Sequence, residues 1–378
     1  MEENASKNFS YVTLGRIIPA GTLAVFYLIF ASVLEPSDYG EVAYLIALAG
    51  TFSVISRFGL PQTLVVFKAK GNLQLTNQIN LLAIITTSAA TVILLFINEF
   101  SALLCLGSSF FFLYQHNLLG EKRYSSFMKN AILRSVLILI IPFPLYFVFD
   151  ISGIILGMAL GNIVSSVLLV KNVTLKVKSF QILKNNFKVL LNNFGVDTSA
   201  NLVIFIDRLL IGSLFGFVSL GVYHFIMQIL YGLEILPRAL YLFLLSEESR
   251  DKKHKNIIYF VVLASGIMVI VVFSFSPLLI EQFFPNYSDG IFPLQILITS
   301  LIPLSISHIF TAKLQATEST KVGYSAIIRI GSLLILLSIL GSIYGLIGFA
   351  FSVLISSILN TVFLFFLYYR YNRQMNVN

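Results

Sequence analysis

Residues 257–280 decide the fold: IIYFVVLASGIMVIVVFSFSPLLI, a stretch with no charged side chain. An α-helix of that length extends about 36 Å, enough to cross the roughly 30 Å hydrocarbon core of a bilayer. The apolar residues follow one another without alternation, which favours a helix over a strand of a membrane barrel. The sequence therefore predicts a membrane-spanning helix here.

Similar stretches occupy most of the chain. The composition is 57% hydrophobic and 11% charged, with a mean hydropathy of +0.89, which excludes a soluble protein of this size. We predict an all-α integral membrane protein of about twelve transmembrane helices. The expected spans are residues 9–34, 41–67, 79–97, 101–119, 130–149, 151–170, 187–214, 217–245, 257–280, 291–316, 323–342 and 345–369.

The positive charges are divided unevenly between the two sides of these spans. With alternate loops assigned to the inside, nineteen of the 25 Lys and Arg lie on the inner side, in loops, in tails or, for Lys188 and Lys313, at the inner ends of spans, and none lies in an outer loop. By the positive-inside rule we expect a multi-pass protein of the cytoplasmic membrane with both termini in the cytoplasm. The net charge of +8 then indicates contact with anionic lipid headgroups, and no nucleic acid is expected as a partner.

The two halves of the sequence resemble each other. The segment 34–40 ends the first span and opens the second, and the segment 217–221 does the same for the seventh and eighth. Gly40 and Gly221 lie at an offset of 181, as do Arg57 and Arg238, and each Arg lies beside Gly or Pro residues that interrupt helices. Near the ends of the halves we match Gly153 with Gly345, at an offset of 192.

This repeat predicts two lobes of six helices each, residues 1–180 and 181–378. The polar stretch at about 171–186 separates them. Because each half has an even number of helices, the repeats are expected to be parallel, related by a pseudo-twofold axis along the membrane normal, as in some transporters.

Several motifs resemble those of polysaccharide (O-antigen, Wzx-type) flippases in the MATE-like MOP exporter superfamily. The matching motifs are Leu34-Glu35-Pro36-Ser37-Asp38-Tyr39-Gly40 with Tyr44, Phe58-Gly59-Leu60-Pro61, Asp207-Arg208, Ile211-Gly212, Gly221-Val222-Tyr223, Leu236-Pro237, Phe284-Pro285-Asn286-Tyr287 and Gly345-Leu346-Ile347-Gly348. The resemblance covers nearly the whole chain. It implies translocation of a polyprenyl-phosphate-linked oligosaccharide by alternating access, with no enzymatic activity and no cofactor.

Apart from Lys188 and Lys313 at the inner span ends, the charged bases within the spans are all Arg, six in number. A phosphate that crosses hydrocarbon needs such donors, because a guanidinium stays charged when desolvated and donates hydrogen bonds in pairs. We single out Arg16, Arg57, Arg208 and Arg238 as candidate substrate-binding residues. For the other two, Arg134 and Arg329, snorkelling to the headgroups at the inner helix ends is a sufficient explanation.

Three acids also lie in the interior of the spans. Asp197 and Glu234 are candidates for binding a coupling H⁺ or Na⁺, because embedded carboxylates often serve that role. Glu234 and Arg238 have the i, i+4 spacing of a helical ion pair, which is the structural alternative. Asp207 adjoins Arg208 and offers a second structural pair. The embedded residues His116, His224 and His308 are expected to be hydrogen-bonded interior groups, and no spacing predicts a metal site.

Two other functions remain open at this point. A MATE-type exporter of small molecules or drugs is the first alternative, although six embedded Arg against three acids favour an anionic cargo over a cationic drug. A membrane polysaccharide polymerase or glycosyltransferase is the second, although no large loop that could hold catalytic groups is expected. The sequence also has no Gly-x-x-x-x-Gly-Lys segment, the phosphate-binding loop of many ATPases.

Overall fold

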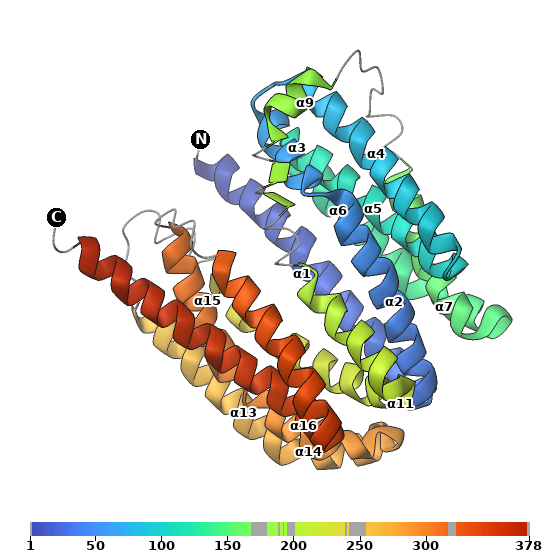
Figure 1. The fold of residues 1–378 in the computed structure, drawn as a ribbon, viewed down its shortest axis with the longest axis vertical. Coiled ribbons are helices and arrows are strands. Elements are labelled where there is room, and N and C mark those ends of the chain that lie inside the picture. Colours follow the sequence, from blue (N-terminus) through green and yellow to red (C-terminus); the bar gives the residue numbers. More distant parts are fainter. Residues whose placement is uncertain are drawn as a thin grey trace. The chain divides into compact units, whose positions relative to one another are not determined.

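The computed structural model describes residues 2–167, 180–187, 190–191, 193–194, 201–238, 240–241, 255–316 and 323–375. All regular elements in these residues are helices, as Figure 1 shows. They are α1 (Glu2–Val33), α2 (Pro36–Arg57), α3 (Leu60–Ala69), α4 (Leu73–Leu95), α5 (Glu99–Gly120), α6 (Tyr124–Ile140), α7 (Pro142–Ser166), α9 (Gln181–Asn185), α11 (Val203–Leu233), α13 (Lys255–Phe283), the 3₁₀ helix η1 (Pro285–Gly290), α14 (Ile291–Ile298), α15 (Leu301–Ala316) and α16 (Gly323–Met375).

The helices have the length and surface of membrane spans. In the described residues eight are long and apolar enough to cross a bilayer, or nine if the pair η1–α14 and α15, bent by 41°, counts as one more. The membrane surface is clearest on α13, where Tyr259, Leu263 and Ile270 are each more than 60% exposed. Such a continuous apolar face is stable only against lipid or another protein. The chain is a multi-pass membrane protein, while the count of twelve helices stays a prediction.

Three of the long helices are interrupted by one residue with positive φ. The interruptions are at Asp150 in α7 (φ 49°), Gly216 in α11 (φ 83°) and Gly345 in α16 (φ 56°). Each lies at or next to a connection predicted for the outer side. A Cβ added to Gly348 would lie 1.9 Å from the carbonyl oxygen of Leu340. The two parts of α16 therefore fold back on each other as a helical hairpin.

The same hairpin geometry corrects one detail of the predicted repeat. Asp150 (φ 49°, ψ −138°) and Gly345 (φ 56°, ψ −130°) have nearly the same backbone conformation and lie at an offset of 195. Gly153 faces the Leu145 carbonyl as Gly348 faces Leu340, again at an offset of 195. The predicted match of Gly153 with Gly345 is therefore wrong. Small residues recur every few positions here, so sequence similarity alone could not distinguish an offset of 192 from one of 195.

The start of the repeat shows an internal symmetry. A Cβ at Gly40 would lie 1.9 Å from the carbonyl oxygen of Phe217, and a Cβ at Gly221 would lie 1.8 Å from that of Pro36. Phe217 follows Pro36 at the same offset, 181, at which Gly221 follows Gly40. Each contact is thus the image of the other, as across a twofold axis. Glycine at both positions lets the two helix starts touch backbone to backbone.

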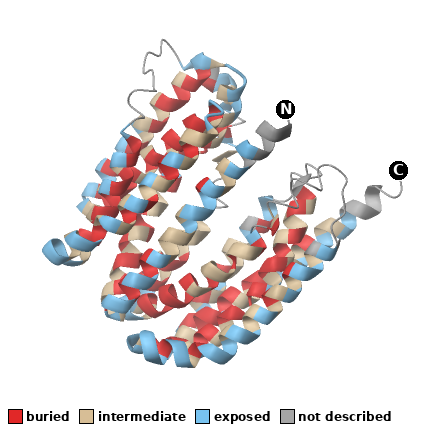
Figure 2. Ribbon diagram, turned by 180° about the vertical axis from the view of Figure 1, so that it is seen from behind, coloured by how far each residue is buried: buried red, intermediate tan, exposed pale blue. Residues whose placement is uncertain are grey.

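The chain divides into two compact units. The first consists of Met1–Phe26 and Glu41–Leu209, and the second of Tyr27–Gly40 and Leu210–Asn378. Buried residues follow the inward sides of the helices within each unit (Figure 2). The core of the first unit includes Leu64 of α3, Ile79 of α4 and Leu113 of α5. The division into lobes at residues 180 and 181 remains a prediction.

Candidate functional site

Arg57 ends α2 in the first unit and is buried. Its side chain is held by two features of that unit: Nε donates to the backbone carbonyl of Ser53 (3.1 Å), and the guanidinium carbon lies 4.3 Å from the centre of the Phe112 ring. The helix is interrupted directly afterwards, because Phe58 and Gly59 have φ of 47° and 66°. The sequence predicts a helix break beside Arg57, and this prediction is confirmed.

Glu234 and Arg238 form the predicted i, i+4 pair in the second unit. Glu234 follows α11 directly, and its N–H bonds to the Leu230 carbonyl, so the helical path continues past the end of the element. Nη2 of Arg238 donates to Oε2 of Glu234 over 2.7 Å. The Arg238 side chain is 50% exposed, whereas that of Glu234 is 2% exposed.

A third residue, which the sequence did not connect with this pair, completes the cluster. Nε2 of His308, in α15, lies 3.0 Å from Oε1 of Glu234. An ionised carboxylate only accepts hydrogen bonds, so the imidazole donates. The apolar side chains of Leu240, Val261 and Ile309 pack together beside this contact and connect α15 to α13. We refer to Glu234, Arg238 and His308 as the acid cluster.

The first unit has a neutral counterpart of the acid cluster. Ser53 precedes Glu234 by the same offset, 181, that separates Arg57 from Arg238. Its hydroxyl accepts a hydrogen bond from Ser109 of α5 over 2.8 Å, and both serines are buried. Each unit therefore joins the helix that carries the arginine to another helix through a buried polar contact. Only the contact in the second unit contains titratable side chains.

The remaining predicted site residues have varied surroundings. Arg16 is exposed on α1. Asp207 and Arg208 of α11 are both buried, and Asp207 accepts a hydrogen bond from the backbone N–H of Arg208 over 2.7 Å. Asp197 lies outside the described residues, so its predicted role in ion binding is untested.

Arg134, for which snorkelling is the predicted explanation, has two partners within the first unit. Its Nε donates to the side-chain oxygen of Asn162 over 2.6 Å, and its guanidinium carbon lies 4.6 Å from the centre of the Phe111 ring. The side-chain oxygen of Asn162 on α7 thus gives this arginine a partner inside the protein. Residues distant in sequence supply these partners, which is why the position of Arg134 within its own span could not predict them.

Lys68 is a basic residue of the first unit that the predicted span 41–67 leaves in the following inner loop. Lys68 in α3 has a side chain only 9% exposed, and its Nζ lies 2.8 Å from a carboxylate oxygen of Glu121. It also donates to Asn117 of α5, whose amide in turn donates to Asn80 of α4 over 2.9 Å. Amide and charged side chains of α3, α4 and α5 thus form one hydrogen-bond network, which joins the three helices. Such polar contacts stabilise helix packing in a membrane, where water does not compete for them.

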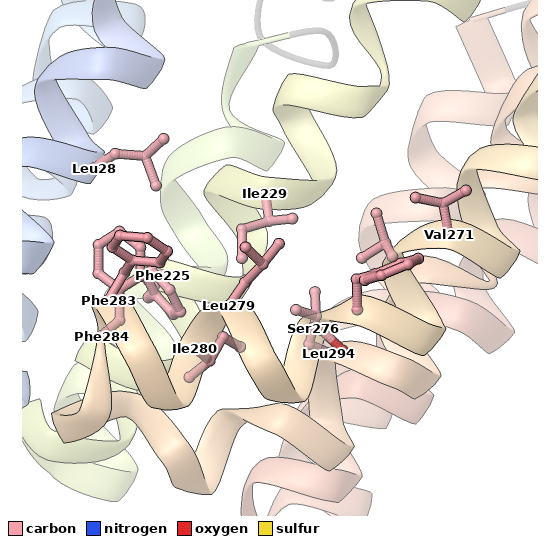
Figure 3. A pocket seen from close by; sticks show the side chains of 12 residues that line it. Leu28, Phe225, Ile229, Val271, Ser276, Leu279, Ile280, Phe283, Phe284 and Leu294 are labelled. Atoms are coloured by element: carbon pink, nitrogen blue, oxygen red, sulfur yellow. The ribbon is translucent and has the colours of Figure 1, made fainter.

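The second unit contains an apolar pocket of about 240 Å³. Figure 3 shows side chains from four helices around it, among them Leu28 of α1, Phe225 of α11, Phe283 of α13 and Leu294 of α14. Ser276 is the only lining residue with a polar side chain. A pocket of this kind can accept hydrocarbon but offers nothing to a phosphate or a sugar. No group of three metal-ligating side chains occurs in the described part of the chain.

Comparison with known proteins identifies the architecture. Residues 5–119 match the family model described as "Polysaccharide biosynthesis protein". A lipid II flippase, MurJ, in an inward closed conformation has 17% identity and a TM-score of 0.76, with 94% of this chain and 86% of that chain covered. The chain has the fold of the MOP exporters. No curated protein matches it in sequence.

Drug transporters share the MOP fold as well. A multidrug resistance MATE transporter of the MOP superfamily matches in its inward-facing conformation at 15% identity, with a TM-score of 0.70 and coverage of 97% and 99%. An outward-facing MATE structure matches at 17% identity, with a TM-score of 0.58 and coverage of 98% and 97%. These neighbours are flippases and transporters and not enzymes. The predicted MATE-like, all-α fold is confirmed.

Proposed function

We propose that this protein is a flippase for lipid-linked oligosaccharides of the polyprenyl-phosphate type, which it moves across the cytoplasmic membrane by alternating access. The observation that carries the proposal is the pair Arg57 and Arg238, which occupy matching places of the repeat in the two units. The family model matched by residues 5–119 supports polysaccharide biosynthesis as the context. The likeness to a lipid II flippase is consistent with a lipid-linked cargo.

The three parts of such a cargo make different demands. The isoprenoid tail can stay in lipid, and the apolar pocket of the second unit could receive only this part. The phosphate needs donors that stay charged away from water, a demand that Arg57 and Arg238 meet. Arg16 and Arg208 are proposed as further contacts along the path, because each is an arginine within a span. Membrane lipids are the other partners.

Proposed localisation and energetics follow from the charge pattern. The cytoplasmic membrane, with both termini in the cytoplasm, fits the distribution of Lys and Arg among the loops. An H⁺ or Na⁺ gradient is the proposed energy source, with Asp197 and Glu234 as the residues that bind the ion. An ion drives transport only through its differential affinity for the two conformations.

Flipping of a fluorescent polyprenyl-pyrophosphate-linked sugar in proteoliposomes tests the proposal. A charge-assisted hydrogen bond contributes about 1.5–3 kcal/mol, so Arg57→Ala or Arg238→Ala should slow flipping by about 10- to 100-fold. Lys at either position should restore part of the rate, because it keeps the charge but loses the paired donors. Arg123→Ala is the matched control, since Arg123 is a half-exposed base on the surface. Unchanged flipping in both Arg57 and Arg238 variants would refute the role of the pair.

A MATE-type exporter of small molecules is the second candidate, supported by the drug transporters that share the fold. The two functions differ in the charge of the cargo. The same proteoliposomes, loaded with a cationic dye and given an ion gradient, would move the dye if the protein exports drugs. Movement of dye without movement of the lipid-linked sugar would favour this second function.

A further inference from the structure

The carboxylate of Glu234 depends on two donors that come from different helices. Arg238 binds one oxygen at 2.7 Å, and His308 of α15 binds the other at 3.0 Å. The Glu234 side chain is 2% exposed, so water contributes little to the stability of its charge. An ionised carboxylate that is buried is stable only while such partners remain.

The two donors, Arg238 and His308, differ in how exposed their side chains are. The side chain of Arg238 is 50% exposed, and a guanidinium carries five N–H donors, of which this contact uses one. An anion can therefore bind Arg238 at the exposed side. The His308 side chain is 20% exposed, more than that of Glu234 and less than that of Arg238. Imidazole is the side chain that commonly changes charge between about pH 5 and 8.

We propose that His308 is a proton-binding residue whose protonation is linked to anion binding at Arg238 through Glu234. The inference rests on the function proposed above and adds the residue through which a proton acts. When a phosphate accepts hydrogen bonds from Arg238, less of the positive charge of Arg238 remains available to Glu234. His308 then takes up a proton from water at Nδ1, while Nε2–H continues to donate to Glu234. The added positive charge compensates the buried carboxylate.

Other charged and titratable groups near the acid cluster limit the size of the effect. Arg329 of α16 is close enough for its charge to act on Glu234. It supplies part of the compensation and so reduces the linked uptake below one full proton. The Tyr241 ring lies 5.9 Å from the His308 ring, and the Tyr231 ring lies 5.8 Å from the guanidinium carbon of Arg238. Neither phenol is expected to ionise near neutral pH.

The first unit indicates that the fold does not require these titratable groups. At the place equivalent to Glu234 it has Ser53, whose partner on the neighbouring helix is Ser109. The contact in the first unit is therefore made by two neutral hydroxyls. The arginine has the same spacing in both units: Arg57 lies four residues after Ser53, and Arg238 lies four residues after Glu234. The second unit thus has titratable groups where the first has neutral hydroxyls, and this difference motivates the inference.

The test is the pH dependence of anion binding by the whole protein in lipid nanodiscs, with farnesyl pyrophosphate as the probe. By linkage, one proton taken up per anion makes the affinity fall tenfold per pH unit, so we expect a several-fold fall per unit between about pH 6 and 8. The probe also titrates, and His308→Gln corrects for this because it retains only the dependence that belongs to the probe. Glu234→Gln should likewise remove the excess pH dependence. His116→Gln is the control, since Nδ1 of His116 lies against a backbone carbonyl of its own helix, that of Phe112.

Proton uptake on anion binding provides a second, independent measurement. Calorimetric titrations with the same probe in two buffers of different ionisation enthalpy give the number of protons bound with each anion. A value clearly above that of the His308→Gln protein supports the inference. Equal values, with binding intact, refute the inference alone. Failure of the probe to bind at any pH would refute the proposed function and the linked inference with it.

Discussion

The close contact between Gly40 and Gly221 makes a quantitative prediction about stability. An added Cβ would lie 1.9 Å from the Phe217 carbonyl oxygen at Gly40 and 1.8 Å from the Pro36 carbonyl oxygen at Gly221. Real Cβ atoms essentially never approach closer than 3.0 Å, so each alanine must push the helix starts apart by about 1 Å. Both obstacles are backbone atoms, which cannot rotate away. Overpacking of this kind costs about 1–3 kcal/mol.

Because the two contacts mirror each other, the two single variants should be equally destabilised, within about 0.5 kcal/mol. The double variant should cost less than their sum, because one separation of the helices relieves both clashes. Gly232→Ala is the control: it is a helical glycine with nothing within 4 Å of the added Cβ, and it should gain about 0.5–1 kcal/mol. Unfolding in mixed micelles followed by circular dichroism measures these free energies. Unequal single variants, or a strictly additive double variant, would refute the shared contact.

Two further predictions concern the outer connections. Asp150 has a backbone conformation that favours glycine, so Asp150→Gly should stabilise the protein by about 1 kcal/mol and Gly345→Ala at the matching position should destabilise it by about 1–3 kcal/mol, both measured by the same unfolding assay. Single cysteines at Ser37 and Ser288 should react with an impermeant thiol reagent added outside intact cells, whereas one at Ser179 should not; labelling at Ser179 from outside would reverse the proposed topology.

Local relations in the sequence predicted local structure well. The contact between Glu234 and Arg238 follows from i, i+4 spacing, which places two side chains on one helix face without reference to the rest of the fold. The break after Arg57 follows from Gly59, because glycine adopts positive φ at little cost. The membrane class follows from apolar length, which depends only on the thickness of the bilayer.

Contacts between distant residues were not predictable in the same way. His308 lies in α15 and its partner Glu234 directly after α11, while Lys68 lies in α3 and its partner Glu121 directly after α5. No periodicity connects such positions, since their meeting depends on how separate helices pack. The loop assignment of Lys68 had the same cause: a lysine near the end of a span is exposed unless a neighbouring helix supplies a carboxylate. The one available signal for His308 was its position in an otherwise apolar span, together with an embedded acid elsewhere.

The polar contacts of the two units lie at matching places but are made by different side chains. Their roles can be tested by giving the second unit the side chains of the first. Replacing both Glu234→Ser and His308→Ser gives the second unit the residues that close the equivalent contact in the first. The smaller side chains leave a cavity, which should cost about 1–3 kcal/mol, but no unpaired buried charge remains. His308→Ser alone removes one of the two donors from Glu234, so the double variant should be less destabilised than the sum of its parts. We expect it to fold, to bind farnesyl pyrophosphate through Arg238, and to lose the excess pH dependence. If the double variant keeps that dependence, the proton binds elsewhere, and Asp197 becomes the residue to examine.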